Sequence, residues 1–139
     1  MLEPPAEARL SWTNYFLNIA TTVSTRADCR RAQHGAIIVD KHHRIIATGY
    51  NGVPSGDPRS CTAGDCPRGL KTAEEIAHSS GEYEDCISLH AEQNAIANAA
   101  QDMRGGTIYI TGKPCPMCSK LILAAGLLTV CPPEDSHGG

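Results

Sequence analysis

The chain has 139 residues and a net charge of −3, and hydrophobic residues make up 41% of it. These values predict one domain with a single core over residues 1–139. No apolar stretch reaches the roughly 18 residues of a membrane span, and residues 1–10 carry acids and prolines where a signal peptide is basic and apolar. We therefore expect a cytoplasmic protein. The negative charge and the 4% of aromatic residues exclude a typical polynucleotide groove, so we expect neither a nucleic-acid nor a membrane partner.

The first half of the chain predicts a helix, a hairpin and a long loop. Residues 7–26 carry apolar side chains at roughly helical spacing. Short apolar runs at 36–39 and 44–50 flank a polar segment, which is typical of a β-hairpin. Residues 51–87 are rich in Gly, Pro, Ser and Asp, with one helical turn expected near 73–77. A loop of this length in a small domain is usually functional or held by additional links.

The second half alternates helices and strands. The pattern predicts a helix at 90–102, a strand at 107–111, a helix at 116–125 and a strand at 127–131. The last three elements form a βαβ unit, which favours parallel pairing with a right-handed crossover. The fold class is therefore α/β, with a mixed sheet and helices on both faces.

Two short motifs hold the residues with metal chemistry. His90 opens one expected helix, and Cys115 and Cys118 open another. Because the two cysteines are three residues apart, they share one face of a helical turn. The positive end of the helix favours their thiolate forms. With His90 they supply three zinc ligands, and three protein ligands leave the fourth tetrahedral position for water, as in a catalytic site.

Glu92 follows His90 by two residues. Within a helix this spacing would point the two side chains in nearly opposite directions. At a helix N-terminus both side chains can lean toward the same metal-bound water. We therefore interpret Glu92 as a proton carrier and not as a ligand. Each motif alone is weak, but the pair is the signature of zinc nucleobase deaminases.

The chain resembles the cytidine and deoxycytidylate deaminase superfamily, and within it the deoxycytidylate and late-competence deaminases. The similarity covers residues 24 to 131. It is carried by these motifs in chain order: Arg26-x-x-Cys29-x-Arg31, Gly35-Ala36-Ile37-Ile38-Val39, Thr48-Gly49-Tyr50-Asn51-Gly52, Cys61, Cys66, Cys86, His90-Ala91-Glu92-x-Asn94-Ala95-Ile96 and Pro114-Cys115-Pro116-Met117-Cys118-Ser119-Lys120. The resemblance implies a three-layer α/β/α, cytidine deaminase-like fold and hydrolytic deamination of a cytosine nucleotide, with dCMP converted to dUMP and ammonia. It also implies a homo-oligomer, since relatives are commonly hexamers.

The resemblance further implies three substrate contacts. Asn51 would hydrogen-bond the sugar, the Ala91 backbone would bind the base carbonyl, and Arg26 would pair with a phosphate. Asn51 also suits a plain turn, and Arg26 also suits a solvated helix end. Lys113 and Arg104 are weaker candidates for the phosphate.

Four further cysteines, Cys29, Cys61, Cys66 and Cys86, are spread around the long loop. Four thiols can close a structural zinc site, which would contribute folding energy that the loop lacks. By resemblance, some family members carry a second zinc near this insertion. Alternatively, some of these thiols are small buried hydrophobes, or His78 replaces one cysteine.

Two other classes of function compete with this interpretation. The same metal ligands would serve a deaminase of cytidine, CMP, dCTP, guanine, adenosine in transfer RNA or a riboflavin precursor. A non-enzymatic, metal-stabilised binding module is the second class. Glu92 beside an open three-ligand site argues against that module, because such a carboxylate has no structural purpose.

Overall fold

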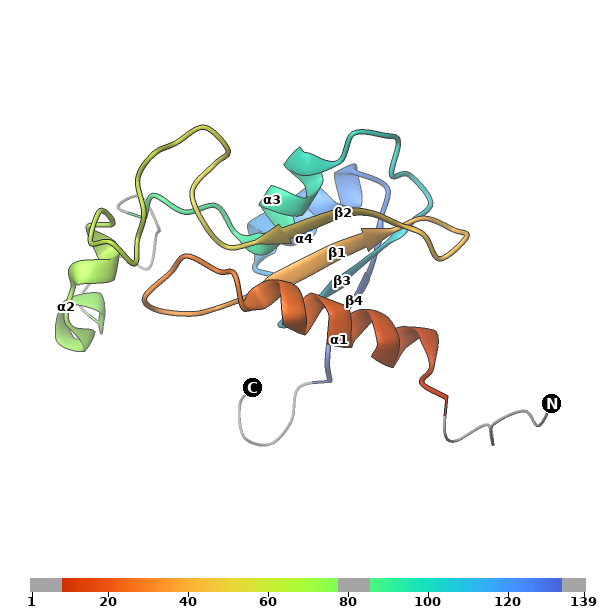
Figure 1. Cartoon of the computed structure of the whole chain (residues 1–139), viewed down its shortest axis with the longest axis horizontal. Helices are drawn as coiled ribbons and strands as arrows, with labels where there is room; N and C mark the ends of the chain where they lie inside the picture. The colour runs from red at the N-terminus through yellow and green to blue at the C-terminus, as the bar shows by residue number, and fades with distance from the viewer. Residues whose placement is uncertain (1–8, 78–85, 134–139) are drawn as a thin grey trace.

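The computed structural model describes residues 9–77 and 86–133. A central sheet has helices on both faces (Figure 1). Within the described segments, no helix combines the length and the apolar character needed to cross a membrane. His78, considered above as a metal ligand, lies outside the described residues.

The sheet is mixed, and its described strands have the order β2-β1-β3-β4. The central strand β1 (Gly35–Val39) pairs antiparallel with β2 (Ile45–Tyr50) on one side and with β3 (Thr107–Ile110) on the other. Strand β4 (Leu128–Val130) pairs parallel with β3. The structure thus confirms the predicted hairpin and the parallel pairing of the βαβ half.

Helix α1 (Trp12–Ser24) covers one face of the sheet (Figure 1). Its buried residues Phe16 and Ala20 pack against the strand residues Ile37, Val39 and Tyr109. The helix lies very close to β1, because a Cβ at Gly35 would collide with the Ala20 carbonyl. Glycine at this position therefore permits the contact between helix and strand.

Helices α3 (Ala91–Asn98) and α4 (Pro116–Ala124) cover the opposite face. Helix α3 lies directly on β2, since a Cβ at Gly49 would collide with the backbone of Ala91 and Ala95. The buried core on this side consists of Ala36, Ile38, Ala91, Ala95, Ile108, Ile110, Ile122 and Leu127. The two cores on the two faces confirm the three-layer α/β/α fold.

Two helices are shorter than their apolar patterns predict. The first begins at Trp12 because the Ser11 side chain caps it by accepting from the Asn14 N–H. Its last N–H groups bond three residues back, so it ends in a tighter turn before the predicted residue 26. Helix α3 ends at Asn98 and not at 102, because Ala99 adopts an extended conformation.

The long loop stands beyond one end of the sheet. Its described part contains a 3-10 turn, Arg68–Leu70, and the short helix α2 (Ala73–Ala77). Figure 1 shows α2 well away from the strands. The structure confirms the predicted helical turn at 73–77.

Candidate metal and catalytic site

His90 and Cys115 each occupy the N-cap position of a helix, as predicted. His90 has extended backbone angles, and its N–H donates to the Gln93 side chain over 2.8 Å. Cys115 caps α4 by accepting from the Cys118 N–H over 3.4 Å, and Pro116 occupies the first turn. Proline is well suited to this position because its fixed φ matches the helix. Local sequence signals therefore place the two N-caps.

The structure brings the three predicted ligand side chains together. The His90 Nδ1 atom lies 3.2 Å from the Cys118 Sγ and 3.6 Å from the Cys115 Sγ. The ligand atoms of the three residues all lie within 4.8 Å of one another. Two thiolates and an imidazole are ligands that zinc prefers, and their number leaves a fourth position free. The donor set therefore fits a catalytic zinc ion.

Cys118, one of the three residues of this cluster, is fully buried. Burial, reinforced by the negative charge of Glu92, raises the pKa of its thiol above the ordinary value. A divalent cation would reverse this effect, because a coordinating thiol is deprotonated. The metal-free surroundings of Cys118 are thus unfavourable for a thiolate, and metal binding would release its proton.

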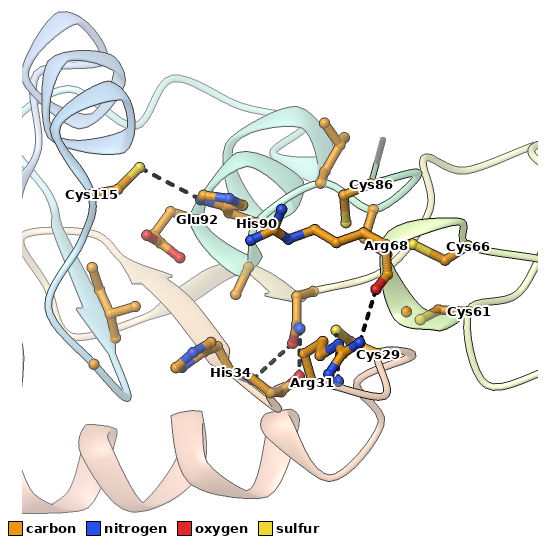
Figure 2. Close-up of a pocket in the computed structure, with 18 of the residues that line it drawn as sticks. Cys29, Arg31, His34, Cys61, Cys66, Arg68, Cys86, His90, Glu92 and Cys115 are labelled. Carbon is orange, nitrogen blue, oxygen red and sulfur yellow. Dashed lines mark hydrogen bonds between the residues drawn. The ribbon is translucent and has the colours of Figure 1, made fainter. Parts of the chain in front are cut away.

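Glu92 is buried, with 6% of its surface exposed. Figure 2 shows its carboxylate beside His90 and Cys115. These three residues, together with Ala91 and Asn51, line a pocket of about 260 Å³. The carboxylate therefore faces the same space as the ligand atoms, as the spacing at the helix start predicts.

The Asn51 amide is already engaged with the backbone of a neighbouring segment. Its Oδ1 accepts from the His34 N–H over 2.8 Å, and its Nδ2 donates to the Ala32 carbonyl over 2.7 Å. An amide can make about twice as many hydrogen bonds as these two. Asn51 thus both anchors residues 32–34 and presents a polar group to the pocket.

Three cationic side chains, Arg31, Arg68 and Lys113, line the pocket. Arg68 is 9% exposed, and Figure 2 shows it reaching from the long loop toward His90. Its carbonyl accepts from the Arg31 guanidinium over 3.1 Å. Sequence patterns missed Arg68 because it lies in an irregular loop without periodicity. The only sequence signal for Arg68 was that it is a cationic residue within the cysteine-bearing insertion.

Arg26 does not line this pocket. It lines a second, polar hollow with Tyr50, Ser60 and Thr62. Arg104 also stays away from the pocket and packs around Gly126. The structure therefore does not bring the first candidate for the phosphate contact to the metal site, and it brings other cations there instead.

The four remaining cysteines of the loop region, Cys29, Cys61, Cys66 and Cys86, line the same pocket. Cys61 and Cys66 are each 1% exposed. Figure 2 shows the group on the side of the pocket opposite Cys115. The ligand atoms of His90, Cys115 and Cys118 all lie within 4.8 Å of one another. Among the described residues, the sulfur atoms of the four loop cysteines do not.

The thiols of this group influence one another. Burial raises the pKa of Cys61 to about 11. Burial acts in the same direction on Cys66, but N–H groups of Ile87 and Gly69 and the thiols of Cys86 and Cys61 donate to its sulfur and hold its pKa below the ordinary value. These donors favour the thiolate form of Cys66, which is the form that binds a metal.

An open three-ligand metal site beside a buried carboxylate, at helix N-termini over a mixed sheet, is typical of a zinc-dependent hydrolase. The family model for the cytidine and deoxycytidylate deaminase zinc-binding region matches residues 10–131. The chain belongs to this family, which confirms the family and the fold predicted from the motifs.

Individual relatives support the same assignment. The deoxycytidylate deaminase of Mycobacterium phage D29 is 40% identical over 131 residues, covering 93% of this chain and 99% of that protein. The deoxycytidylate deaminase of Schizosaccharomyces pombe is 34% identical over 128 residues, covering 91% of this chain but 38% of that longer protein. The dCMP deaminase of the cyanophage S-TIM5, solved in complex with dCMP and dUMP, superposes with a TM-score of 0.63 at 27% identity, over 98% of this chain and 90% of that one.

Proposed function

We propose that this chain hydrolyses dCMP to dUMP and ammonia. The observation that carries the proposal is the convergence of His90, Cys115 and Cys118 within 4.8 Å, with Glu92 buried in the same pocket. Zinc, when bound by these three residues, supplies a water molecule that ionises near neutral pH. The named relatives are deoxycytidylate deaminases, and the cyanophage structure holds substrate and product. They favour the nucleoside monophosphate among the alternatives.

In this proposal Glu92 moves the protons. Its carboxylate accepts a proton from the attacking water and passes it to ring N3, while a bond forms between the water oxygen and C4. It then takes the remaining proton from the new C4 hydroxyl group and gives it to the amino group, the C4–N bond breaks as the C4 carbonyl forms, and ammonia leaves. One buried carboxylate thus acts first as base and then as acid. The Ala91 backbone holds the base carbonyl, and Asn51 contacts the sugar.

The cations of the pocket are candidates for phosphate recognition. Arg31, Arg68 and Lys113 line the pocket that holds Glu92, whereas Arg26 lines another hollow. An arginine can bind two phosphate oxygens at once. We assign the main phosphate contact to Arg68 because it is the most buried of these cations and reaches toward His90.

A second, structural zinc ion is part of the proposal. The group of Cys29, Cys61, Cys66 and Cys86 supplies four thiols, the ligand set of closed structural zinc sites. The donors around Cys66 lower the pKa of its thiol and so favour the thiolate, the form that binds a metal. A metal bound by these thiols would stabilise the loop, which otherwise makes few apolar contacts.

A homo-oligomer in the cytoplasm completes the proposal. Large apolar side chains are exposed on α4 and β4, with Met117 at 64%, Leu123 at 78% and Leu128 at 71%. Exposed apolar groups that gather on neighbouring elements favour a protein contact. Free cysteines in clusters suit a reducing compartment.

A substrate panel tests the proposed reaction. Purified protein with bound zinc is incubated with dCMP, CMP, dCTP, deoxycytidine, guanine and transfer RNA, and ammonia and the deaminated products are measured. We expect the highest kcat/KM with dCMP. The Glu92→Ala protein serves as the blank. Faster ammonia release from guanine, from transfer RNA or from the bare nucleoside would show that the protein prefers a substrate other than dCMP. No ammonia release from any of these compounds would favour a binding module.

A further inference from the structure

Asn94 lies one helical turn after His90 on α3 and is 8% exposed. Its Nδ2 donates to the Tyr50 carbonyl over 2.9 Å and to the Gly52 carbonyl over 3.1 Å. Because both partners are acceptors, only the NH₂ end of the amide can face them. The Asn94 side chain therefore bonds to the residue before Asn51 and to the residue after it.

The segment around Asn51 is also bonded on its other sides. Gly52 and Leu89 exchange two backbone hydrogen bonds of 3.2 and 2.8 Å. The Asn51 carbonyl accepts from the Asp28 N–H over 2.9 Å. These bonds tie residues 50–52 to the approach to His90 and to the preceding loop. Within residues 9–77 and 86–133, the Asn94 amide is the side chain that hydrogen-bonds this segment to the helix that His90 caps.

We propose that Asn94 is a positioning residue, which holds Asn51 in a fixed place relative to the His90 metal site. Removing its amide leaves two largely buried carbonyls without this donor, and the 50–52 segment can then move away from α3. Asn51 would present its amide to the substrate less favourably, while the zinc ligands stay in place. The inference rests on the proposed function, because it needs Asn51 to contact the substrate.

The chain supplies a matched control on the same helix. Asn98 lies one turn further along α3, and its Nδ2 donates to the Thr48 carbonyl of the same strand over 3.3 Å. Asn98 is exposed and does not line the pocket. Replacing it removes an amide–carbonyl hydrogen bond between α3 and β2 without touching the Asn51 segment. Because Asn94 is buried and makes two such bonds, the Tm of both variants is measured as well, so that a general loss of stability is recognised.

The test compares Asn94→Ala and Asn98→Ala, each alone and combined with Asn51→Ala. We expect Asn94→Ala to raise the KM for dCMP and the Kd for dUMP about tenfold, the order of one hydrogen bond between Asn51 and the substrate, with kcat and zinc content little changed. Asn98→Ala should leave both constants within about twofold. With Asn51→Ala already present, adding Asn94→Ala should raise the KM and the Kd hardly any further, because the two residues act through one contact with the substrate.

Three outcomes would overturn the inference. Equal effects of Asn94→Ala and Asn98→Ala would make Asn94 a general structural residue. Independent, multiplying losses of Asn94→Ala and Asn51→Ala would separate the two side chains. Wild-type protein that neither binds dUMP nor deaminates dCMP would remove the proposed function itself. If Asn94→Ala does not fold, Asn94→Ser keeps a donor at this position, and the same comparison of KM and Kd is made with it.

Discussion

The two cysteine groups of this protein are held in different ways. Cys115 and Cys118 lie in the first turn of α4, which packs on the sheet, and His90 caps the neighbouring helix. The loop cysteines are positioned instead by bonds between distant residues. The Arg30 side chain, for example, donates to the carbonyls of Cys61 and Thr62, more than thirty positions away.

This difference has consequences for stability and chemistry. Helix N-termini over a packed core hold their side chains before any metal arrives, so the catalytic site is preorganised. A loop held by exposed hydrogen bonds gains much of its order from any metal that it binds. We therefore expect the helix-based group to determine activity and the loop-based group to determine stability and substrate selectivity.

The largest expected effect comes from removing a thiolate on α4. In Cys115→Ser the hydroxyl still caps the helix, but a zinc ligand is lost, so activity should fall by at least the 10²–10⁴-fold typical of lost catalytic groups. Zinc analysis and ammonia release are measured together. Cys131→Ser, which changes a cysteine that does not line the pocket, is the control. Unchanged zinc content and turnover in Cys115→Ser would contradict the ligand assignment.

Cys61→Ser should separate stability from chemistry. We expect the protein to lose one of two zinc ions per chain, to unfold at a lower temperature and to become protease-sensitive within residues 51–77. The ligands around His90 are untouched, so kcat should change far less than in Cys115→Ser. Metal analysis of wild-type protein purified without chelator decides the stoichiometry. One zinc ion per chain would show that these thiols are ordinary buried residues.

Arg68→Ala tests whether the loop recognises the phosphate. Loss of a charge-assisted contact should raise the KM for dCMP about tenfold or more, with little change for deoxycytidine, which has no phosphate. Arg26→Ala is the matched control, because Arg26 lines a separate hollow. A selective loss in Arg26→Ala and none in Arg68→Ala would restore the interpretation drawn from the sequence motif.

The smallest expected effect concerns Asp28, which ties the loop to the segment after α1. Its carboxylate accepts from the Thr62 N–H, the Thr62 hydroxyl and the Ser60 hydroxyl. Burial is the largest single influence and opposes the charged form, but these donors together outweigh it and lower the pKa of Asp28. The contribution to stability is thus full above the unfolded pKa of about 3.9 and is lost as the pH falls below it. The difference in Tm between wild type and Asp28→Asn should therefore be small at pH 7 and become smaller still as the pH falls through the lowered pKa of the folded state; a difference that does not change with pH would contradict this.

The sequence predicts the helix-based site well and the loop-based site poorly. The helix starts of this site follow from local signals in the sequence. These signals are the apolar periodicity, the proline at position 116 and the spacing of Cys115 and Cys118. The position of Arg68 depends on a hydrogen bond that its carbonyl accepts from the guanidinium of Arg31, 37 residues earlier. No local sequence pattern records this bond. The same holds for Asn94, whose amide donates hydrogen bonds to the carbonyls of Tyr50 and Gly52, more than forty positions earlier.

The most direct test of the account is the turnover and zinc content of Glu92→Gln. The amide keeps the size of the carboxylate but cannot carry a proton from water to the substrate. With dCMP we expect wild-type zinc content, dUMP binding close to that of the wild type, and a kcat lower by about 10²–10⁴-fold or more. Near-normal ammonia release by this variant would contradict the role of Glu92 as the proton carrier beside a three-ligand zinc site.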